Sequence, residues 1–441
     1  MFGIVDLVFI CLFAVIYAWT FYNLPIIAAG VRNARKNRLK LQAQDVVEGK
    51  FLPSFSIIVP AKNEGKMIDR IFSALSKLDY PKDKVEIVVV EDASDDNTFE
   101  LCEKYARTLG NVKVLQRSRS NGKPSALNFG LRHCEGELIA VFDADNVPAS
   151  GVLLKAAQYF EDSSVAAVQG RTMSINVNEN MLTQFVSYEE AVWCEAYLRG
   201  KDCLGLFVHL KGSCQFIRRN VLQRLSGFDE NTLSEDMELS ARLAEQGYGI
   251  RYGGDVCAWQ ESPSSLKTLF RQRTRWFRGT MELAFKYGRL MAKPCKRNFD
   301  AEVTLLGPFI IIASLLSYFA ASGALFVSYP FDVIWRTLSF LSLVSTTGMF
   351  LLAGAMLVCV SKPKRLRNLL WLPFVFSYWC LQSFIALYAA MLILLRRPKV
   401  WLKTEKNGTV ANSAFVLETE LVLTEDVKAS APGVKAEDFR S

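Results

Sequence analysis

Residues 138–145 read LIAVFDAD, a short apolar run that ends in two acidic residues. An uninterrupted apolar run of this length is typical of a strand that is buried on both faces of a parallel sheet. Three similar runs precede it, separated by segments with helical spacing: the runs are residues 56–59, 85–90 and 112–115, and the helical segments are residues 66–78 and 97–109. This alternation predicts an α/β domain with a mostly parallel sheet that binds a nucleotide.

Polar and acidic residues follow three of the predicted strands. They are residues 60–64 (PAKNE), 91–95 (EDASD) and 143–145 (DAD). Ligands of open α/β sheets bind beyond the carboxyl ends of the strands. One such segment is a weak signal, whereas three of them predict a single crevice lined by acidic groups.

The D-x-D pair of Asp143 and Asp145 is a candidate metal site. Hard cations such as Mg²⁺ and Mn²⁺ bind carboxylate and phosphate oxygens, and a cation between them neutralises charge on a departing nucleotide diphosphate. A D-x-D in isolation is more often a turn or a solvated loop. Its position directly after a buried strand favours the metal site, with Mg²⁺ or Mn²⁺ as the expected cofactor.

Two further polar positions each have two interpretations. Lys123 begins a predicted helix, where its ammonium and the free backbone N–H groups suit phosphate oxygens, although an ordinary capped helix has the same pattern. Asp236 precedes a helix predicted for residues 237–246 and suits the single general base of an inverting sugar transfer. An Asp at a helix start also caps free N–H groups, and the spacing does not separate the two roles.

The segment Gln272-Arg273-Thr274-Arg275-Trp276 falls on a basic helix predicted to begin near Ser264. Arginine pairs with diphosphates and tryptophan stacks on sugar rings. This cluster therefore suits both the diphosphate of a nucleotide donor substrate and the acceptor substrate. A basic helix ahead of a membrane segment also serves as an interfacial anchor, and the two roles are compatible.

Four apolar stretches are long enough to cross a bilayer: residues 8–29, 305–327, 335–360 and 371–395. The net charge of +8 lies largely in short runs beside them, at residues 32–40 and 362–367, which predicts membrane orientation rather than nucleic-acid binding. The first basic run places the following domain in the cytosol. Four crossings would leave the basic run at 396–406 outside, so one stretch is interfacial or one crossing is missed.

The expected division of the chain has four parts. Residues 1–50 hold a transmembrane helix and a basic segment, residues 51–290 a cytosolic catalytic domain, residues 291–404 interfacial and transmembrane helices, and residues 405–441 a flexible tail. Ten cysteines without a CxxC pair suggest neither a zinc site nor a disulfide scaffold, and only two histidines argue against a multi-histidine metal centre. Acid–base chemistry is therefore left to carboxylates.

The order of these motifs over residues 55–279 resembles that of the membrane-bound family-2 glycosyltransferases, the group of cellulose, chitin, hyaluronan and poly-N-acetylglucosamine synthases. The shared features are D-x-D, then E-D after a glycine-rich segment, then Q-x-x-R-W. The resemblance implies a GT-A fold, a Rossmann-like α/β domain, together with a nucleotide-sugar donor that is most often a UDP-sugar. It also implies a divalent metal and inversion at the anomeric carbon.

The resemblance also implies roles for residues on the donor side. Asp92 and Asp143 would contact the nucleotide, Lys123 the diphosphate side of the donor, and Asp145 the metal. Glu91 stands where the family usually has an Asp, which leaves Asp92 to make the contact.

On the acceptor side, Asp236 would be the general base, and Ser234 replaces the commoner threonine before the E-D pair. The remaining assignments are Gln272 and Arg275 to the donor diphosphate, and Trp276, Gly212, Ser213 and Glu235 to the acceptor.

The expected function is therefore synthesis of a β-linked polysaccharide by a multi-pass protein of the cell membrane, with export through its helices or with a partner protein. One alternative is transfer of a single sugar to a lipid or lipid-linked acceptor. A remote alternative is a non-catalytic membrane transporter or scaffold that binds a nucleotide. The expected partners are the nucleotide sugar, a glycan or lipid-linked acceptor and the lipid bilayer.

Overall fold

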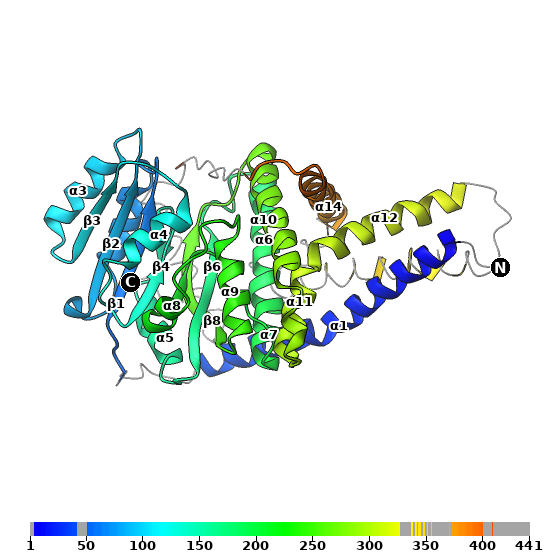
Figure 1. Ribbon diagram of the computed structural model, residues 1–441, viewed down its shortest axis with the longest axis horizontal. Coiled ribbons are helices and arrows are strands. Elements are labelled where there is room, and N and C mark those ends of the chain that lie inside the picture. Colours follow the sequence, from blue (N-terminus) through cyan, green and yellow to red (C-terminus); the bar gives the residue numbers. More distant parts are fainter. Residues whose placement is uncertain are drawn as a thin grey trace, which may run out of the picture.

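The computed structural model describes residues 4–41, 51–326 and 372–399, together with Gly408 and isolated positions between 337 and 370. Most of the apolar stretch predicted at residues 335–360, and nearly all of the tail predicted from residue 405, lie outside the described residues. In Figure 1 the sheet and its helices form one end of the molecule, and α1 (Ile4–Leu41) and α12 (Gly307–Phe326) extend from the other.

An eight-stranded sheet organises the domain, in the order β3-β2-β1-β4-β7-β6-β8-β5. The strands are β1 (Phe55–Ala61), β2 (Val85–Asp92), β3 (Val112–Arg117), β4 (Leu138–Val141), β5 (Val147–Pro148), β6 (Val165–Ser174), β7 (Gln215–Arg218) and β8 (Gly249–Gln260). The first four coincide with the four apolar runs of the sequence, so the predicted strands are confirmed.

The sheet is mixed, with its parallel pairs concentrated on one side. β1 pairs in parallel with β2 and with β4, β2 with β3, and β6 with β8. β7 lies antiparallel between β4 and β6, and β5 lies antiparallel to β8. The carboxyl ends of β1, β2 and β4 therefore meet at one edge, as the acidic strand ends predict.

Alternate residues of the central strands enter two separate cores. Ile57 and Val59 of β1 pack on one face of the sheet, and Ile58 packs on the other. Helices α2 (Ile68–Leu75), α3 (Thr98–Thr108) and α5 (Val152–Tyr159) cover the first face, and α4 (Lys123–Leu131), α8 (Arg219–Arg224) and α9 (Glu235–Glu245) cover the second. Each fully buried Ile or Val contributes about 1.5–3 kcal/mol, so burial on both faces favours central strands in which most residues are apolar.

The remaining described elements lie around this layered core. They are η1 (Lys82–Lys84), α6 (Met181–Val192), the π-helical turn η2 (Trp193–Leu198), α7 (Arg199–Leu204), α10 (Leu266–Tyr287), η3 (Leu290–Ala292), α11 (Lys296–Leu305) and α14 (Leu372–Leu394).

Two described helices are long and apolar enough to cross a membrane, in the windows Ile10–Ala34 and Pro373–Leu394. The helix Lys296–Leu305 and the segment Gly307–Phe319 form a third candidate if the pair, bent by 53°, is one span. Pro308 follows the bend, and a proline removes a helical N–H and favours such a break. The predicted crossings at 8–29, 305–327 and 371–395 thus fall on α1, α12 and α14.

The second half of α1 packs against the α/β domain at two glycine positions. A Cβ on Gly200 of α7 would lie 1.9 Å from the carbonyl oxygen of Ile26, and a Cβ on Gly30 would lie 1.9 Å from that of Ala196. Both distances are far below any allowed contact. The two backbones therefore approach as closely as they do because neither position carries a side chain.

A buried ion pair joins the same region to α11. The ammonium of Lys201 on α7 lies 2.9 Å from Asp300 Oδ2, and both side chains are inaccessible to solvent. The Tyr22 hydroxyl of α1 donates to Asp300 Oδ1 at 2.9 Å, and the Phe207 N–H donates to Asp300 Oδ2 at 2.9 Å. Three parts of the chain that are distant in sequence are thus held by one carboxylate.

We expect Gly200→Ala to destabilise the protein by roughly 1–3 kcal/mol, because the added Cβ must displace the α1 backbone. Gly110→Ala is the matched control, since a Cβ at Gly110 would meet nothing within 4 Å. Thermal unfolding of both variants in detergent measures the difference. Equal melting temperatures for the two variants would show that the close approach of α1 and α7 is not required.

Candidate active site

Lys123 stands at the first position of α4, at the edge where the parallel strands end. Gly122 before it has φ of +89°, a conformation that favours glycine. The Lys123 ammonium lies 2.6 Å from Asp143 Oδ1 and 3.6 Å from Glu235 Oε1, and it donates to the Gly212 carbonyl oxygen at 2.8 Å. One cation thus joins α4, the end of β4, the start of α9 and the segment before β7.

Asp236 completes this group, which we call the Lys123 cluster: Lys123, Asp143, Glu235 and Asp236. A Cβ on Gly212 would lie 3.1 Å from Asp236 Oδ2 and 3.3 Å from the Lys123 ammonium, so the absent side chain leaves room between these charges. Asp236 also accepts the N–H of Met237 at 2.7 Å. The N-cap residue of α9 is Ser234 rather than Asp236, so this contact lies within the first turn of the helix and is not an N-cap bond.

The charges of the Lys123 cluster do not balance, since three carboxylates face one ammonium. Burial and, to a smaller extent, the neighbouring Glu235 raise the pKa of Asp236 to about 7, against the opposing effects of the Met237 N–H, Lys123 and Arg275. Burial lowers the pKa of Lys123, but the carboxylates of Asp143, Glu235 and Asp236 outweigh it and hold the pKa above its usual range. Lys123 thus stays charged, and Asp236 changes charge near neutrality.

The two carboxylates of the D-x-D pair have different surroundings. The Asp143 side chain is 36% exposed, whereas Asp145 is 4% exposed and accepts the Glu261 N–H at 3.2 Å. Asp143 N–H donates to the Ser213 hydroxyl at 3.0 Å, and Ser213 donates to Asn146. Ser213 therefore holds the backbone that carries both carboxylates.

The residues present fit a cation that is shared with a diphosphate. Within the described ranges, no group of three or more His, Cys, Asp or Glu side chains is placed to hold a metal by itself. Mg²⁺ in phosphate-handling sites is commonly bound by one or two carboxylates, with phosphate oxygens completing its coordination. Two carboxylates after β4 and an excess of negative charge in the Lys123 cluster match that donor set.

Asp92 lies at the end of β2 and makes two contacts outside the Lys123 cluster. Its carboxylate lies 2.7 Å from the Arg117 guanidinium, and the Ser120 hydroxyl donates to it at 2.6 Å. Sequence reasoning did not find Arg117 or Ser120 as partners. The parallel register of β2 and β3, which aligns Asp92 with Arg117, is the signal that identifies the pair.

Helix α10 lies over the segment that carries Asp236. Arg275 donates to the Leu233 carbonyl oxygen at 3.4 Å, and a Cβ on Gly279 would lie 2.2 Å from the Ser234 hydroxyl oxygen. Trp276 is 38% exposed. In the described part of the chain, no hydrogen bond or ion pair joins Gln272 or Trp276 to the Lys123 cluster, whereas the charge of Arg275 acts on Asp236 and lowers its pKa.

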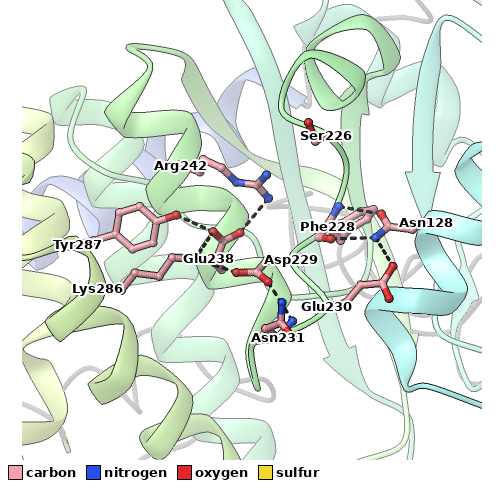
Figure 2. A pocket seen from close by; sticks show the side chains of 10 residues that line it. All are labelled: Asn128, Ser226, Phe228, Asp229, Glu230, Asn231, Glu238, Arg242, Lys286 and Tyr287. Carbon is pink, nitrogen blue, oxygen red and sulfur yellow. Dashed lines mark hydrogen bonds and ion pairs between the residues drawn. The ribbon is translucent and has the colours of Figure 1, made fainter.

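An open cavity of about 630 Å³ lies beside α9, and no residue of the Lys123 cluster lines it. Charged side chains that line the cavity pair with one another, as Figure 2 shows. Glu238 accepts hydrogen bonds from Arg242, Lys286 and Tyr287, and Asp229 forms an ion pair with Lys286. None of the site residues predicted from the sequence lines this cavity. The cavity is therefore a feature separate from the predicted site.

His209 has no place in this chemistry. It is buried, and burial together with Lys201 and Lys211 lowers its pKa to about 3. The ring is therefore neutral at physiological pH.

Comparison with known proteins gives the family. The model of "Glycosyltransferase like family 2" matches residues 53–279. The probable glycosyltransferase YdaM of Bacillus subtilis is 29% identical over 372 residues, which cover 81% of this chain and 88% of that protein. The beta-monoglucosyldiacylglycerol synthase of Trichormus variabilis is 33% identical over 295 residues, which cover 65% of this chain and 61% of that protein.

A similar solved structure agrees on the fold. The mannosyltransferase PcManGT from Pyrobaculum calidifontis, in complex with GDP-Man and Mn²⁺, has a TM-score of 0.56 at 20% identity, covering 88% of this chain and all of that one. The GT-A fold expected from the sequence is therefore confirmed, and the alternative of a non-catalytic transporter or scaffold is set aside. The matched family model, the curated relatives and this fold together show that the chain belongs to glycosyltransferase family 2 and is an enzyme that transfers a sugar from a nucleotide donor.

Proposed function

We propose that this enzyme transfers a hexose or N-acetylhexosamine from a UDP-sugar with inversion, and that Asp236 is the general base. The observation that carries the proposal is the Lys123 cluster, in which Asp236, with a pKa of about 7, lies beside the charged Lys123 ammonium at the carboxyl edge of the sheet. A general base is most effective when its pKa lies near the working pH.

The chemical step needs one base and one stabilised leaving group. Asp236 takes the proton from the acceptor hydroxyl as its oxygen attacks the anomeric carbon. The bond from that carbon to the diphosphate oxygen breaks on the opposite face, which inverts the configuration. Lys123 and Arg275 face the negative charge that develops on the departing diphosphate. A single carboxylate suffices, unlike the paired carboxylates of glycoside hydrolases.

The donor is held in this proposal by residues from four segments. Asp92 and Asp143 contact the nucleotide, and Lys123, Gln272 and Arg275 contact the diphosphate. Asp145 would hold Mg²⁺ or Mn²⁺, and a bound cation would supply charge neutralisation on the diphosphate. The support is the position of Asp143 and Asp145 directly after β4, with backbone and side chain fixed by Ser213 and the Glu261 N–H.

The acceptor lies on the α10 side of the Lys123 cluster in this proposal. Trp276 offers an exposed indole ring, and Gly212, Ser213 and Glu235 line the approach to Asp236. We propose a growing β-linked polysaccharide as the acceptor, because the D-x-D, E-D and Q-x-x-R-W motifs occur together as in polysaccharide synthases. An aromatic ring suits a sugar chain that must slide by one residue after each transfer.

A membrane lipid is the second candidate acceptor. It is favoured by the 33% identity to a beta-monoglucosyldiacylglycerol synthase over 295 residues. In that case one sugar is transferred to a lipid hydroxyl that the apolar helices bring to the site.

The placement in the cell belongs to the same proposal. Helices α1, α12 and α14 would cross the cell membrane, with residues 51–290 as the catalytic domain on the cytosolic face and residues 291–404 as interfacial and membrane helices. The support is the basic run at residues 32–40 and the apolar windows of α1 and α14. An export partner is compatible with this arrangement.

Replacing the proposed base is the first test. We expect Asp236→Asn to lower kcat by about 10²–10⁴-fold, because the amide cannot accept the hydroxyl proton. UDP affinity should stay near that of the parent enzyme. In the parent, kcat/KM should rise with pH through about 7, since only the ionised carboxylate of Asp236 accepts a proton. Glu230→Gln is the control, because it keeps the oxygen that accepts from Asn128. Undiminished activity in Asp236→Asn would remove the base assignment.

The second test removes the side chain of Asp145, the proposed metal ligand. We expect Asp145→Ala to abolish the increase in UDP affinity that Mn²⁺ produces in the parent enzyme, because the cation loses its protein carboxylate. Titration calorimetry with and without Mn²⁺ measures this, with exposed Asp83 changed to Ala as control. Unchanged affinity in the presence of Mn²⁺ would count against the role of Asp145.

The acceptor class is tested with the protein in lipid nanodiscs and a panel of radiolabelled UDP- and GDP-sugars with Mg²⁺ or Mn²⁺. We expect one donor to give a product of high molecular weight on a gel. A short product that extracts into organic solvent would instead establish the lipid acceptor. Boiled protein serves as the control.

A further inference from the structure

Arg273 is the one residue of the Q-x-x-R-W segment that lies buried against its neighbours yet has no part in the proposed chemistry. Its guanidinium carbon lies 4.3 Å from the centre of the Trp276 ring, and the residue is only 9% exposed. A guanidinium over an indole face is attracted by the ring and restricts its orientation. Trp276 therefore has one face covered from within the protein, while the residue as a whole remains more than a third exposed.

The Arg273 side chain is itself held from two other helices. It lies 2.7 Å from Glu189 Oε2 on α6, and the Tyr378 hydroxyl of α14 donates to the same oxygen at 2.6 Å. Next to this carboxylate, Leu269 of α10 packs with Phe185 and Tyr378 in one apolar cluster. The Phe185 and Tyr378 rings stack at 5.8 Å. One carboxylate oxygen thus connects α6, α10 and the apolar helix α14.

We propose that Arg273 is a positioning residue for Trp276, and that Glu189 and Tyr378 hold it in place, so that docking of α14 on α10 orients the acceptor side of the site. The inference rests on the proposed role of Trp276 in acceptor binding. Its physical basis is that a largely buried guanidinium needs a paired carboxylate. Because Glu189 also accepts from Tyr378, the position of the guanidinium depends on where α14 lies. The ring of Trp276 follows the guanidinium.

The first test observes Trp276 without using activity. The full-length protein in nanodiscs is labelled with 5-fluorotryptophan, and the ¹⁹F resonance of Trp276 is identified by its loss in Trp276→Phe. We expect this resonance to shift in Arg273→Met, which removes the planar charge, and to shift less in Tyr378→Phe, which removes only one hydroxyl. Lys267→Met and Tyr388→Phe are matched controls on α10 and α14, and they should leave the resonance unchanged.

The second test is a double-mutant cycle on acceptor binding, with n-octyl β-D-glucoside as the acceptor probe and the donor identified by the panel. If Arg273 acts through Trp276, Arg273→Met should raise the KM for the probe about fivefold, with the donor KM unchanged. In a Trp276→Ala background the same change should then have less than about a twofold effect, because the ring it orients is gone.

The outcomes separate this inference from the function on which it rests. Three results would each overturn the positioning role. They are an unmoved Trp276 resonance in Arg273→Met, a raised donor KM in that variant, and a probe KM in the double variant that equals the product of the two single effects. If Arg273→Met does not fold, the smaller shift expected in Tyr378→Phe decides the question. A shifted resonance combined with unchanged probe KM in Trp276→Ala would support the positioning role and reject the acceptor role of Trp276.

Discussion

The Lys123 ammonium is the interaction on which the arrangement of the candidate site depends. Removing carboxylates from water costs several kcal/mol for each ion, so they converge only where a cation opposes their charge. Lys123 supplies that cation to the end of β4 and the start of α9, and it also binds the Gly212 carbonyl oxygen. Burial, reinforced by the neighbouring Glu235, raises the pKa of Asp236 towards neutrality. Three carboxylates for one ammonium also leave an excess of negative charge, which favours cation binding.

The same principle connects the catalytic domain to its apolar helices. The solvent-inaccessible pair of Lys201 and Asp300 joins α7 to α11, and Tyr22 of α1 donates to the same carboxylate. Beside it, α1 and α7 approach closely because Gly30 and Gly200 lack side chains. The apolar helix α1 is thus held against α7 and α11 by one buried ion pair with its tyrosine partner and by two glycines that lack Cβ atoms. On the far side, α14 contacts α10 near Trp276.

The sequence predicted features that depend on neighbouring residues along the chain, such as the strands. It did not predict contacts between residues that are distant in the sequence. The four apolar runs became β1 to β4, since burial on both faces of the central strands favours runs in which most residues are apolar. The partner of Asp92 was not predicted, because only the register of β2 and β3 places Arg117 beside it. Arg273 was seen as part of a basic helix, although its contacts with Glu189 and Tyr378 make it a link between three helices.

The sequence by itself determined the α/β class, the acidic ends of the parallel strands, the order of the motifs and the apolar stretches. All of these are patterns of run length and spacing, which depend only on neighbours along the chain. The tertiary structure alone decided that β7 lies antiparallel between β4 and β6, and that Gly212, just before β7, comes beside Asp236 and Lys123. These contacts join residues far apart in sequence, and they form only when burial and charge pairing bring the segments together.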